Sequence, residues 1–219
     1  MLFEAERRRM VELQLRRRGI HDERVLEAMF MTPRHEFVPA QFLERAYDDH
    51  PFPLGERETI SQPYMVAAMT EAARIQPRDK VLEVGTGSGY QAAVLSFMGG
   101  QVWSIERKAS LAESARARLL RLGYSGIEVI CSDGTEGYLP AAPYQAVLVT
   151  AASPQVPVAL IEQLAEGGRL VIPVGDLHSQ RLELIVKSPS GLSTRMCHAC
   201  QFVPLIGKYG WPDETFPPL

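Results

Sequence analysis

From Val81 to Tyr90 the sequence reads Val-Leu-Glu-Val-Gly-Thr-Gly-Ser-Gly-Tyr, an apolar segment that continues directly into three closely spaced glycines. The apolar part predicts a buried parallel strand, and the apolar spacing from Gln91 to Met98 predicts a helix after the glycines. A glycine loop between a strand and a helix lets the backbone approach a nucleotide-like ligand at the carboxyl end of the strand. The segment therefore predicts the ligand-binding turn of an open α/β sheet.

The spacing of these glycines differs from that of a dinucleotide-binding turn. In the fingerprint Gly-x-Gly-x-x-Gly, Gly85 and Gly87 fit the first two positions, but Tyr90 stands at the third and Gly89 comes one residue early. An acidic residue, Glu83, also precedes the turn within the strand. This arrangement resembles motif I of the class I S-adenosylmethionine-dependent methyltransferases, whose cofactor has no pyrophosphate and therefore does not require the third glycine.

A second acidic residue strengthens the prediction of a cofactor site. The next predicted strand, 101–105, ends at Glu106, which is 21 residues after Gly85. An acid about 20 residues after the glycine turn typically binds a ribose, because a carboxylate accepts hydrogen bonds from two hydroxyl groups. The alternative is a polar residue that merely ends the strand. Asp133 and Gly134 form another polar strand end, where an adenine could be held.

Length and composition indicate an ordinary globular protein. The 219 residues suffice for one α/β domain with a full core. The net charge of −3 argues against nucleic acid as a partner. No apolar run reaches the length of a membrane span, and the charged N-terminus does not resemble a signal peptide. The odd number of cysteines, three, argues against a disulfide framework, so we expect a cytoplasmic location. We also expect a monomer.

Strands and helices alternate along the central part of the chain. Apolar segments predict further strands and helices, at 127–131, 146–150 and 169–174 for the strands and at 110–122 and 156–164 for the helices. This alternation predicts a parallel sheet of βαβ units. Segments 181–186 and 194–203 have no helix between them, and the turn Ser188–Gly191 predicts an antiparallel hairpin. We expect a Rossmann-like α/β fold of the class I methyltransferase type, mostly parallel, with this hairpin at its C-terminal end.

The chain before the glycine turn predicts an N-terminal helical extension. Helices are expected at 4–18, after Asp22 as an N-cap, and from Pro39. From Tyr47 to Ser61 the periodicity vanishes, which predicts a loop. We expect a single domain, 1–219, in which 1–60 supply helices and a substrate-side loop and 61–205 the cofactor-binding core. The tail, 206–219, is expected to be irregular and to fold over the site, join an oligomer contact or pack on the surface.

A more specific resemblance lies in Thr59-Ile60-Ser61-Gln62-Pro63, because a generic methyltransferase does not require this segment. Together with the glycine loop it resembles the protein-L-isoaspartate (D-aspartate) O-methyltransferases. Further segments share the resemblance: 33–39, 46–48, 133–134, 149–152 and 202–205. The match covers about residues 5–207.

This resemblance implies an activity and a set of site residues. The family uses S-adenosylmethionine to methylate the free carboxylate of L-isoaspartyl and D-aspartyl residues in damaged proteins and peptides, and S-adenosylhomocysteine is the product. The ester cyclises to a succinimide and partly reopens as normal aspartate, which is repair. By the resemblance, Ser61 is the active-site residue. The implied substrate-binding residues are Thr59, Ile60, Val203, Pro204 and Leu205. The implied cofactor-binding residues are Gln62, Glu83, Gly85, Thr86, Gly87, Ser88, Glu106, Arg107, Asp133 and Gly134.

The chemistry of a carboxylate acceptor suits a serine. A carboxylate with a pKa near about 4 is already ionised at neutral pH, so no general base is required. The enzyme must align the carboxylate and exclude water. A hydroxyl can hold the carboxylate without neutralising it, so our hypothesis is that Ser61 orients the acceptor. The alternative is that Ser61 is the N-cap of the helix expected from Pro63 to about Ile75.

Three positions depart from the family pattern. Gly55-Glu56-Arg57-Glu58 lacks the second glycine and the glutamine that are common before Thr-Ile-Ser. Gln145 stands where an aspartate is usual, and Gln201 stands where an arginine is frequent in bacterial members. The alternative functions are another class I methyltransferase acting on a different carboxyl group or a small molecule, and a non-catalytic protein that binds S-adenosylmethionine. A nicotinamide dehydrogenase fits least, because Gly89 is misplaced for it.

One cysteine pair has the spacing of half a metal site. Cys197 and Cys200 form a Cys-x-x-Cys sequence with no second pair, and they lie in a strand pattern rather than a turn. Alternation along a strand should point these two side chains to opposite faces. We therefore expect no metal site.

Overall fold

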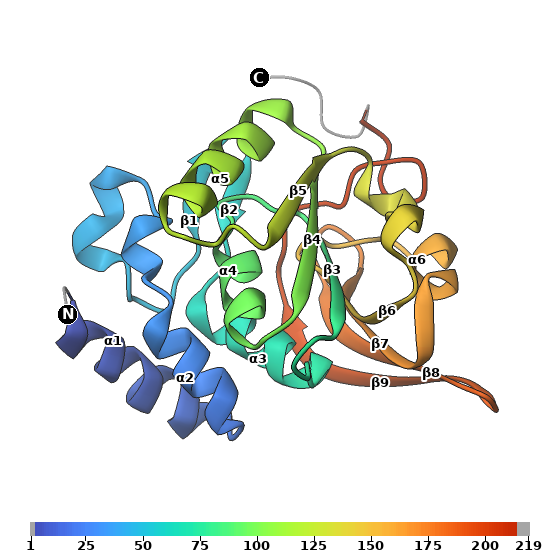
Figure 1. The fold of residues 1–219 in the computed structure, drawn as a ribbon, viewed down its shortest axis with the longest axis horizontal. Coiled ribbons are helices and arrows are strands. Elements are labelled where there is room, and N and C mark those ends of the chain that lie inside the picture. The colour runs from blue at the N-terminus through green and yellow to red at the C-terminus, as the bar shows by residue number, and fades with distance from the viewer. Residues whose placement is uncertain (1–2, 214–219) are drawn as a thin grey trace.

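A seven-stranded sheet forms the centre of the computed structural model, which describes residues 3–213 (Figure 1). The strand order is β5-β4-β3-β6-β7-β8-β9. The strands are β3 (Lys80–Val84), β4 (Gln101–Glu106), β5 (Ile127–Cys131), β6 (Tyr144–Val149), β7 (Leu164–Gly175), β8 (Gln180–Ser188) and β9 (Gly191–Cys200). Neighbours from β5 to β7 pair in parallel, whereas β8 and β9 pair antiparallel. The predicted fold class, including the C-terminal hairpin, is confirmed.

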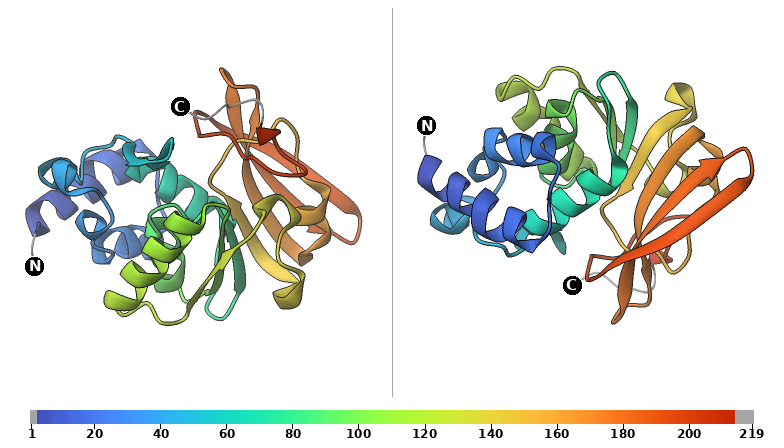
Figure 2. Two further views of the ribbon diagram at one scale, coloured as in Figure 1. Left: turned by 90° about the horizontal axis from the view of Figure 1, so that it is seen from above. Right: turned by 90° about the horizontal axis from the view of Figure 1, so that it is seen from below.

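Helices cover both faces of the sheet, because alternate strand residues are apolar toward each side. One apolar core lies under α3 (Pro63–Ala73), α4 (Tyr90–Phe97) and α5 (Ala109–Arg121), and the N-terminal helices add to it from beyond α3 and α4 (Figure 2). The opposite core lies under α6 (Val158–Glu162). The helix predicted over 156–164 is shorter than expected, because β7 already begins at Leu164, which pairs with Tyr144.

The N-terminal extension is helical, as predicted. It comprises α1 (Glu4–Arg9), a π-helical segment Met10–Leu15, a 3-10 turn Arg16–Arg18 and α2 (Glu23–Met31). Asp22 is the N-cap of α2, and its carboxylate accepts a hydrogen bond from the Arg24 amide at 2.9 Å. The helix expected from Pro39 is a 3-10 segment, Ala40–Arg45, and another 3-10 turn covers Arg34–Glu36.

The prediction of a loop between Tyr47 and Ser61 is wrong. Two short strands, β1 (Phe52–Gly55) and β2 (Glu58–Ile60), pair antiparallel and form a sheet separate from the central one. Their turn places Glu56 at φ 51° and Arg57 at φ 62°, the left-handed region that favours Asn and Gly. The sequence has neither residue there, so the usual hairpin signal is missing.

The described part of the tail folds back on the end of β5. The Gly207 amide donates to the Trp211 carbonyl at 3.1 Å, which closes a small loop. The Lys208 amide donates to Asp133, and the Tyr209 amide donates to Thr135. Residues 206–213 are therefore irregular but anchored, as a surface segment beside the sheet, while 214–219 of the predicted tail lie outside the described residues.

Candidate active site

The glycine turn after β3 adopts a backbone that other residues rarely adopt. Gly85, Gly87 and Gly89 have φ angles of 99°, 51° and 86°. A Cβ added to Gly85 would also clash with the Oγ1 of Thr150, whose hydroxyl donates to the Gly85 carbonyl at 2.7 Å. The turn is thereby held against the end of β6, and its backbone is exposed to a ligand at the carboxyl edge of the sheet.

Glu83 lies beneath this turn and is fully buried. The Ser104 hydroxyl donates to its Oε2 atom and is itself 2.6 Å from the Thr86 hydroxyl. Within the described residues no donor has good hydrogen-bond geometry at the other oxygen, Oε1, although the Ala92 amide interacts with the carboxylate and opposes the rise of its pKa. Burial raises the pKa of Glu83 to about 8, and the nearby charge of Glu106 acts in the same direction. A cation bound near this carboxylate would favour its ionised form, in which Oε1 is a hydrogen-bond acceptor.

Glu106 ends β4 beside the turn, as predicted. Its Oε2 atom accepts a hydrogen bond from the Gly87 amide at 3.0 Å, and its Oε1 atom accepts one from the Lys108 amide at 3.0 Å. Two backbone donors thus fix the carboxylate, while each oxygen keeps a second lone pair. The group lines the pocket, so it can accept hydrogen bonds from a pair of ligand hydroxyls.

Ser61 connects β2 to α3 and lines the same pocket. The N-cap of α3 is Gln62, which makes no side-chain capping bond, and the Tyr64 amide donates to Asp49 Oδ1 at 2.9 Å. The interpretation of Ser61 as a helix N-cap is therefore wrong. Asp49 satisfies the helix end, so helix capping does not occupy the serine hydroxyl.

One pocket gathers most of the predicted residues. Those in its wall are Thr59, Ile60, Ser61, Glu83, Gly85, Thr86, Gly87, Ser88, Glu106, Arg107, Gly134, Val203, Pro204 and Leu205. Wall residues that the sequence analysis did not assign to the site include Glu58, Gln91, Thr150 and Ile206. Thr150 follows a strand, so the rule that ligands bind at carboxyl strand ends could have identified it. Gln91 could have been identified because it is a polar residue within an apolar helix, and the structure buries it.

Two predicted cofactor residues point elsewhere. The Asp133 carboxylate accepts hydrogen bonds from the Thr135 amide at 2.8 Å, the Thr135 hydroxyl at 2.7 Å and the Lys208 amide at 2.8 Å. It thus anchors the C-terminal segment and is not part of the pocket wall. The Gln62 side chain is 3.5 Å from Asp49 Oδ2 and likewise lies outside the wall. Their neighbours Gly134 and Ser61 do line the pocket.

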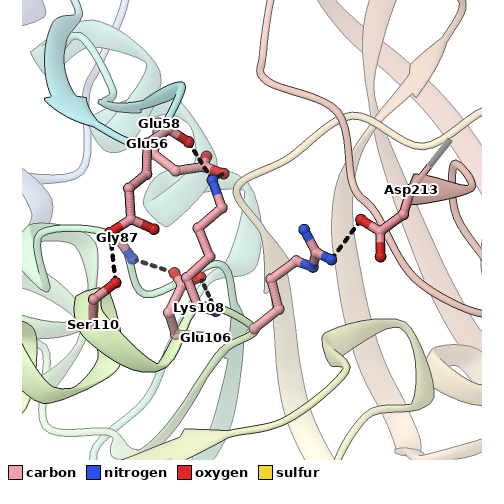
Figure 3. Close-up of polar contacts among 8 residues, drawn as sticks. Glu56, Glu58, Gly87, Glu106, Lys108, Ser110 and Asp213 are labelled. Carbon is pink, nitrogen blue, oxygen red and sulfur yellow. Dashed lines mark hydrogen bonds and ion pairs between the residues drawn. The ribbon is translucent and has the colours of Figure 1, made fainter. Parts of the chain in front are cut away.

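The positions that depart from the family pattern have separate structural roles. Glu58 lines the pocket, and its Oε1 atom is 2.6 Å from the Lys108 ammonium (Figure 3). Burial nevertheless raises the pKa of Glu58. Gln145 accepts a hydrogen bond from the Lys80 amide at 2.8 Å, at the amino ends of β3 and β6 and away from the pocket. Gln201 is exposed.

The prediction that the side chains of Cys197 and Cys200 point to opposite faces of their strand is wrong. Both side chains pack partly against the same core, because the register of β8 and β9 shifts between Arg181 and Glu183. Among residues 3–213, no group of three or more His, Cys, Asp or Glu side chains gathers as a metal site would require. In the same part of the chain, none of the helices is long and apolar enough to cross a membrane.

A sheet that runs parallel up to β7 and then reverses twice is the arrangement of class I S-adenosylmethionine-dependent methyltransferases. The glycine turn after β3 lies where that class binds its cofactor. Comparison with known proteins is more specific. Residues 5–210 match the model of the protein-L-isoaspartate(D-aspartate) O-methyltransferase family, and the chain belongs to this family.

Individual relatives agree along nearly the whole chain. A protein-L-isoaspartate O-methyltransferase of Methanoculleus marisnigri is 54% identical over 212 residues, which are 97% of this chain and 96% of the relative. One of Roseiflexus castenholzii is 52% identical over 217 residues, 99% of each chain. A solved protein-L-isoaspartate O-methyltransferase, 30% identical, superposes with a TM-score of 0.84 over 93% of this chain and 67% of its own. A Plasmodium falciparum structure in complex with S-adenosyl-L-homocysteine shares the fold at 24% identity, with a TM-score of 0.78 over 91% of this chain and 98% of its own.

Proposed function

We propose that this protein transfers a methyl group from S-adenosylmethionine to the free carboxylate of L-isoaspartyl and D-aspartyl residues in damaged proteins and peptides. The observation that carries the proposal is the shared pocket, which is lined by Thr59–Ser61 and Val203–Leu205 together with the glycine turn and Glu106. Cyclisation of the ester to a succinimide, followed by partial opening to normal aspartate, makes the reaction a repair step.

The residues of the pocket fit the cofactor. S-adenosylmethionine supplies an electrophilic methyl group on a sulfonium, together with an ammonium group and a ribose diol. The Glu106 carboxylate, fixed by two amides, would accept the diol, and the turn Gly85–Gly87 would allow close backbone approach. The Oε1 atom of Glu83 would attract the ammonium group. Gly134 follows β5 and begins a 3-10 turn that packs against Val84, and its backbone at the pocket wall would contact the adenine.

On the substrate side, Ser61 would orient the acceptor carboxylate by donating its hydroxyl hydrogen. The neighbouring Thr59 and Ile60 would shape the wall and exclude water. Val203–Leu205 are held extended, because the Ala152 amide donates to the Val203 carbonyl and the Leu205 amide donates to the Ala152 carbonyl, both at 2.8 Å. We assign the peptide backbone of the substrate to this segment. Alignment is the main requirement, since the acceptor is already ionised.

We further infer a cytoplasmic monomer, organised as one domain over 1–219, that does not act on nucleic acid. The net charge of −3 provides no basic field for a polyanion. The three cysteines, Cys131, Cys197 and Cys200, are free thiols, which suits a reducing compartment.

A matched pair of peptides tests the proposal. The purified protein is incubated with labelled S-adenosylmethionine and either an isoaspartyl peptide or its aspartyl counterpart, and base-labile label on the peptide is measured. Label on the isoaspartyl peptide alone is expected. Equal label on both peptides would indicate a different carboxyl methyltransferase, and label on neither, with cofactor bound, would indicate a non-catalytic binding protein.

A Ser61→Ala variant then tests the active-site residue. Loss of one hydrogen bond to a charged acceptor should lower kcat by about 10- to 100-fold. The dissociation constant for S-adenosylhomocysteine, measured by calorimetry, should remain within about twofold of the wild-type value, because the lost hydrogen bond is to the substrate carboxylate and not to the cofactor. A comparable loss of cofactor affinity would instead mean that Ser61 has a mainly structural role.

A further inference from the structure

The turn between β4 and α5, Glu106-Arg107-Lys108, contacts the β1–β2 hairpin at the pocket wall and the C-terminal segment outside the wall. Glu106 lines the pocket itself. The Lys108 side chain extends to the β1–β2 hairpin (Figure 3). The Arg107 guanidinium donates to Asp213 Oδ1 at 2.6 Å. Three consecutive residues thus connect the expected ribose site to two segments that are distant in the sequence.

The contact of Lys108 is the better shielded of the two. Its ammonium group lies 2.6 Å from Glu58 Oε1 and also donates to the Glu56 carbonyl, and the Lys108 and Glu58 side chains are 20% and 22% exposed. The Ser110 hydroxyl adds a hydrogen bond to Glu56 Oε1 at 2.5 Å. By contrast, the Asp213 side chain that meets Arg107 is 70% exposed. Exposed pairs are weak, so Lys108 provides the stronger connection.

The hairpin depends on such contacts for its position. A two-stranded sheet is marginally stable on its own, and left-handed φ angles at Glu56 and Arg57 add strain. The hairpin lies directly over the glycine turn: a Cβ on Gly87 would be 3.6 Å from Leu54 Cδ1 and 4.0 Å from the Thr59 carbonyl oxygen. The same Gly87 donates its amide hydrogen to Glu106.

We propose that Lys108 is a positioning residue that holds the β1–β2 hairpin closed over the cofactor and thereby places Ser61. Glu58 begins β2, and Ser61 follows that strand directly, so fixing Glu58 fixes the approach of Ser61 to the pocket. Ribose binding at Glu106 and placement of Ser61 are thus coupled through one turn. The inference rests on the cofactor assignment in the proposed function.

The test compares Lys108→Met with the wild-type chain. Dissociation of S-adenosylhomocysteine, followed by rapid mixing with excess competitor, should become about tenfold faster, because one charged hydrogen-bonded contact that holds the pocket closed is lost. Hydrogen–deuterium exchange over 52–60 should rise, while exchange in β3 and β4 should stay unchanged. Lys108→Arg keeps the charge and reach and should restore most of both properties.

Two further variants separate positioning from general stability. Arg121→Met removes an ion pair with Glu36 at the other end of α5, 3.0 Å long and away from the hairpin, and should leave both readouts unchanged. In Glu58→Gln, a subsequent Lys108→Met change should have a smaller effect than in the wild type, because the two residues act as a pair.

Unchanged dissociation and unchanged exchange over 52–60 in Lys108→Met would overturn the proposal, as would an equal effect of Arg121→Met. If the wild-type chain binds no S-adenosylhomocysteine, the cofactor assignment itself fails. In that case, hydrogen–deuterium exchange over 52–60, compared between the ligand-free wild-type chain and Lys108→Met, still decides whether Lys108 fixes the position of the hairpin.

Discussion

Replacing Glu83 by Gln should make the protein more stable at alkaline pH and less able to bind its cofactor. Gln has the same shape and can accept the Ser104 hydrogen bond, but it carries no charge. Glu83 is fully buried and its pKa is raised from 4.5 to about 8. The wild-type chain must therefore protonate this residue or bury a charge, whereas the variant does neither.

The direction follows from proton linkage. Because the folded-state pKa of Glu83 lies above its unfolded value, its contribution to stability is fully present below pH 4.5 and is lost as pH rises to about 8. A pKa difference of this size corresponds to about 5 kcal/mol in the free energy of unfolding as an upper limit, since local rearrangement relieves part of it. The Glu83→Gln variant does not lose this stability, so the free energies of unfolding of the two proteins should be similar at pH 4.5 and should diverge toward pH 8.5.

Urea denaturation at several pH values measures this difference. Other groups titrate identically in both proteins, so subtracting the two stability curves isolates Glu83. We expect a gain for the variant of at least about 2 kcal/mol at pH 8.5, with a Tm higher by at least about 4 °C. Parallel curves across the whole pH range would refute the argument. Calorimetry should show weaker binding of S-adenosylmethionine, because the Oε1 acceptor is lost.

Two other substitutions test the backbone around the pocket. Gly85→Ala should abolish cofactor binding and lower the free energy of unfolding by about 2 kcal/mol or more, since its Cβ meets Thr150 at a left-handed φ; thermal denaturation with and without S-adenosylhomocysteine checks both effects. Arg57→Gly should raise stability by about 0.5 to 1 kcal/mol by relieving strain at φ 62°. An unchanged or lower urea midpoint would show that the hairpin turn is not strained.

Features encoded in contiguous residues could be predicted from the sequence. The strand, turn and helix around Gly85–Gly89 follow from apolar spacing and from the need for positive φ angles. Glu106 could be identified because parallel strands end at one edge of the sheet, which brings it beside Gly87. The C-terminal hairpin could be predicted because Ser188–Gly191 interrupts two alternating segments.

Features that depend on contacts between segments distant in the sequence could not be predicted in this way. The β1–β2 hairpin was missed because Glu56 and Arg57 occupy a turn that usually requires Asn or Gly. Asp133 faces the C-terminal segment only because Lys208, 75 residues later, lies beside it. The shared face of Cys197 and Cys200 results from a register shift that alternation alone does not reveal.

The residues of the pocket wall are spread along the sequence from Glu58 to Ile206. This separation determines when, during synthesis, the chain can first bind its cofactor. A nascent chain that has emerged only through β6 already contains the glycine turn and Glu106, yet it lacks the segment Val203–Ile206 that closes the opposite wall. Ligand binding stabilises only a chain that can form the site. Cellular S-adenosylmethionine would therefore stabilise the chain only after Val203–Ile206 have left the ribosome, and not while the parallel sheet is being assembled.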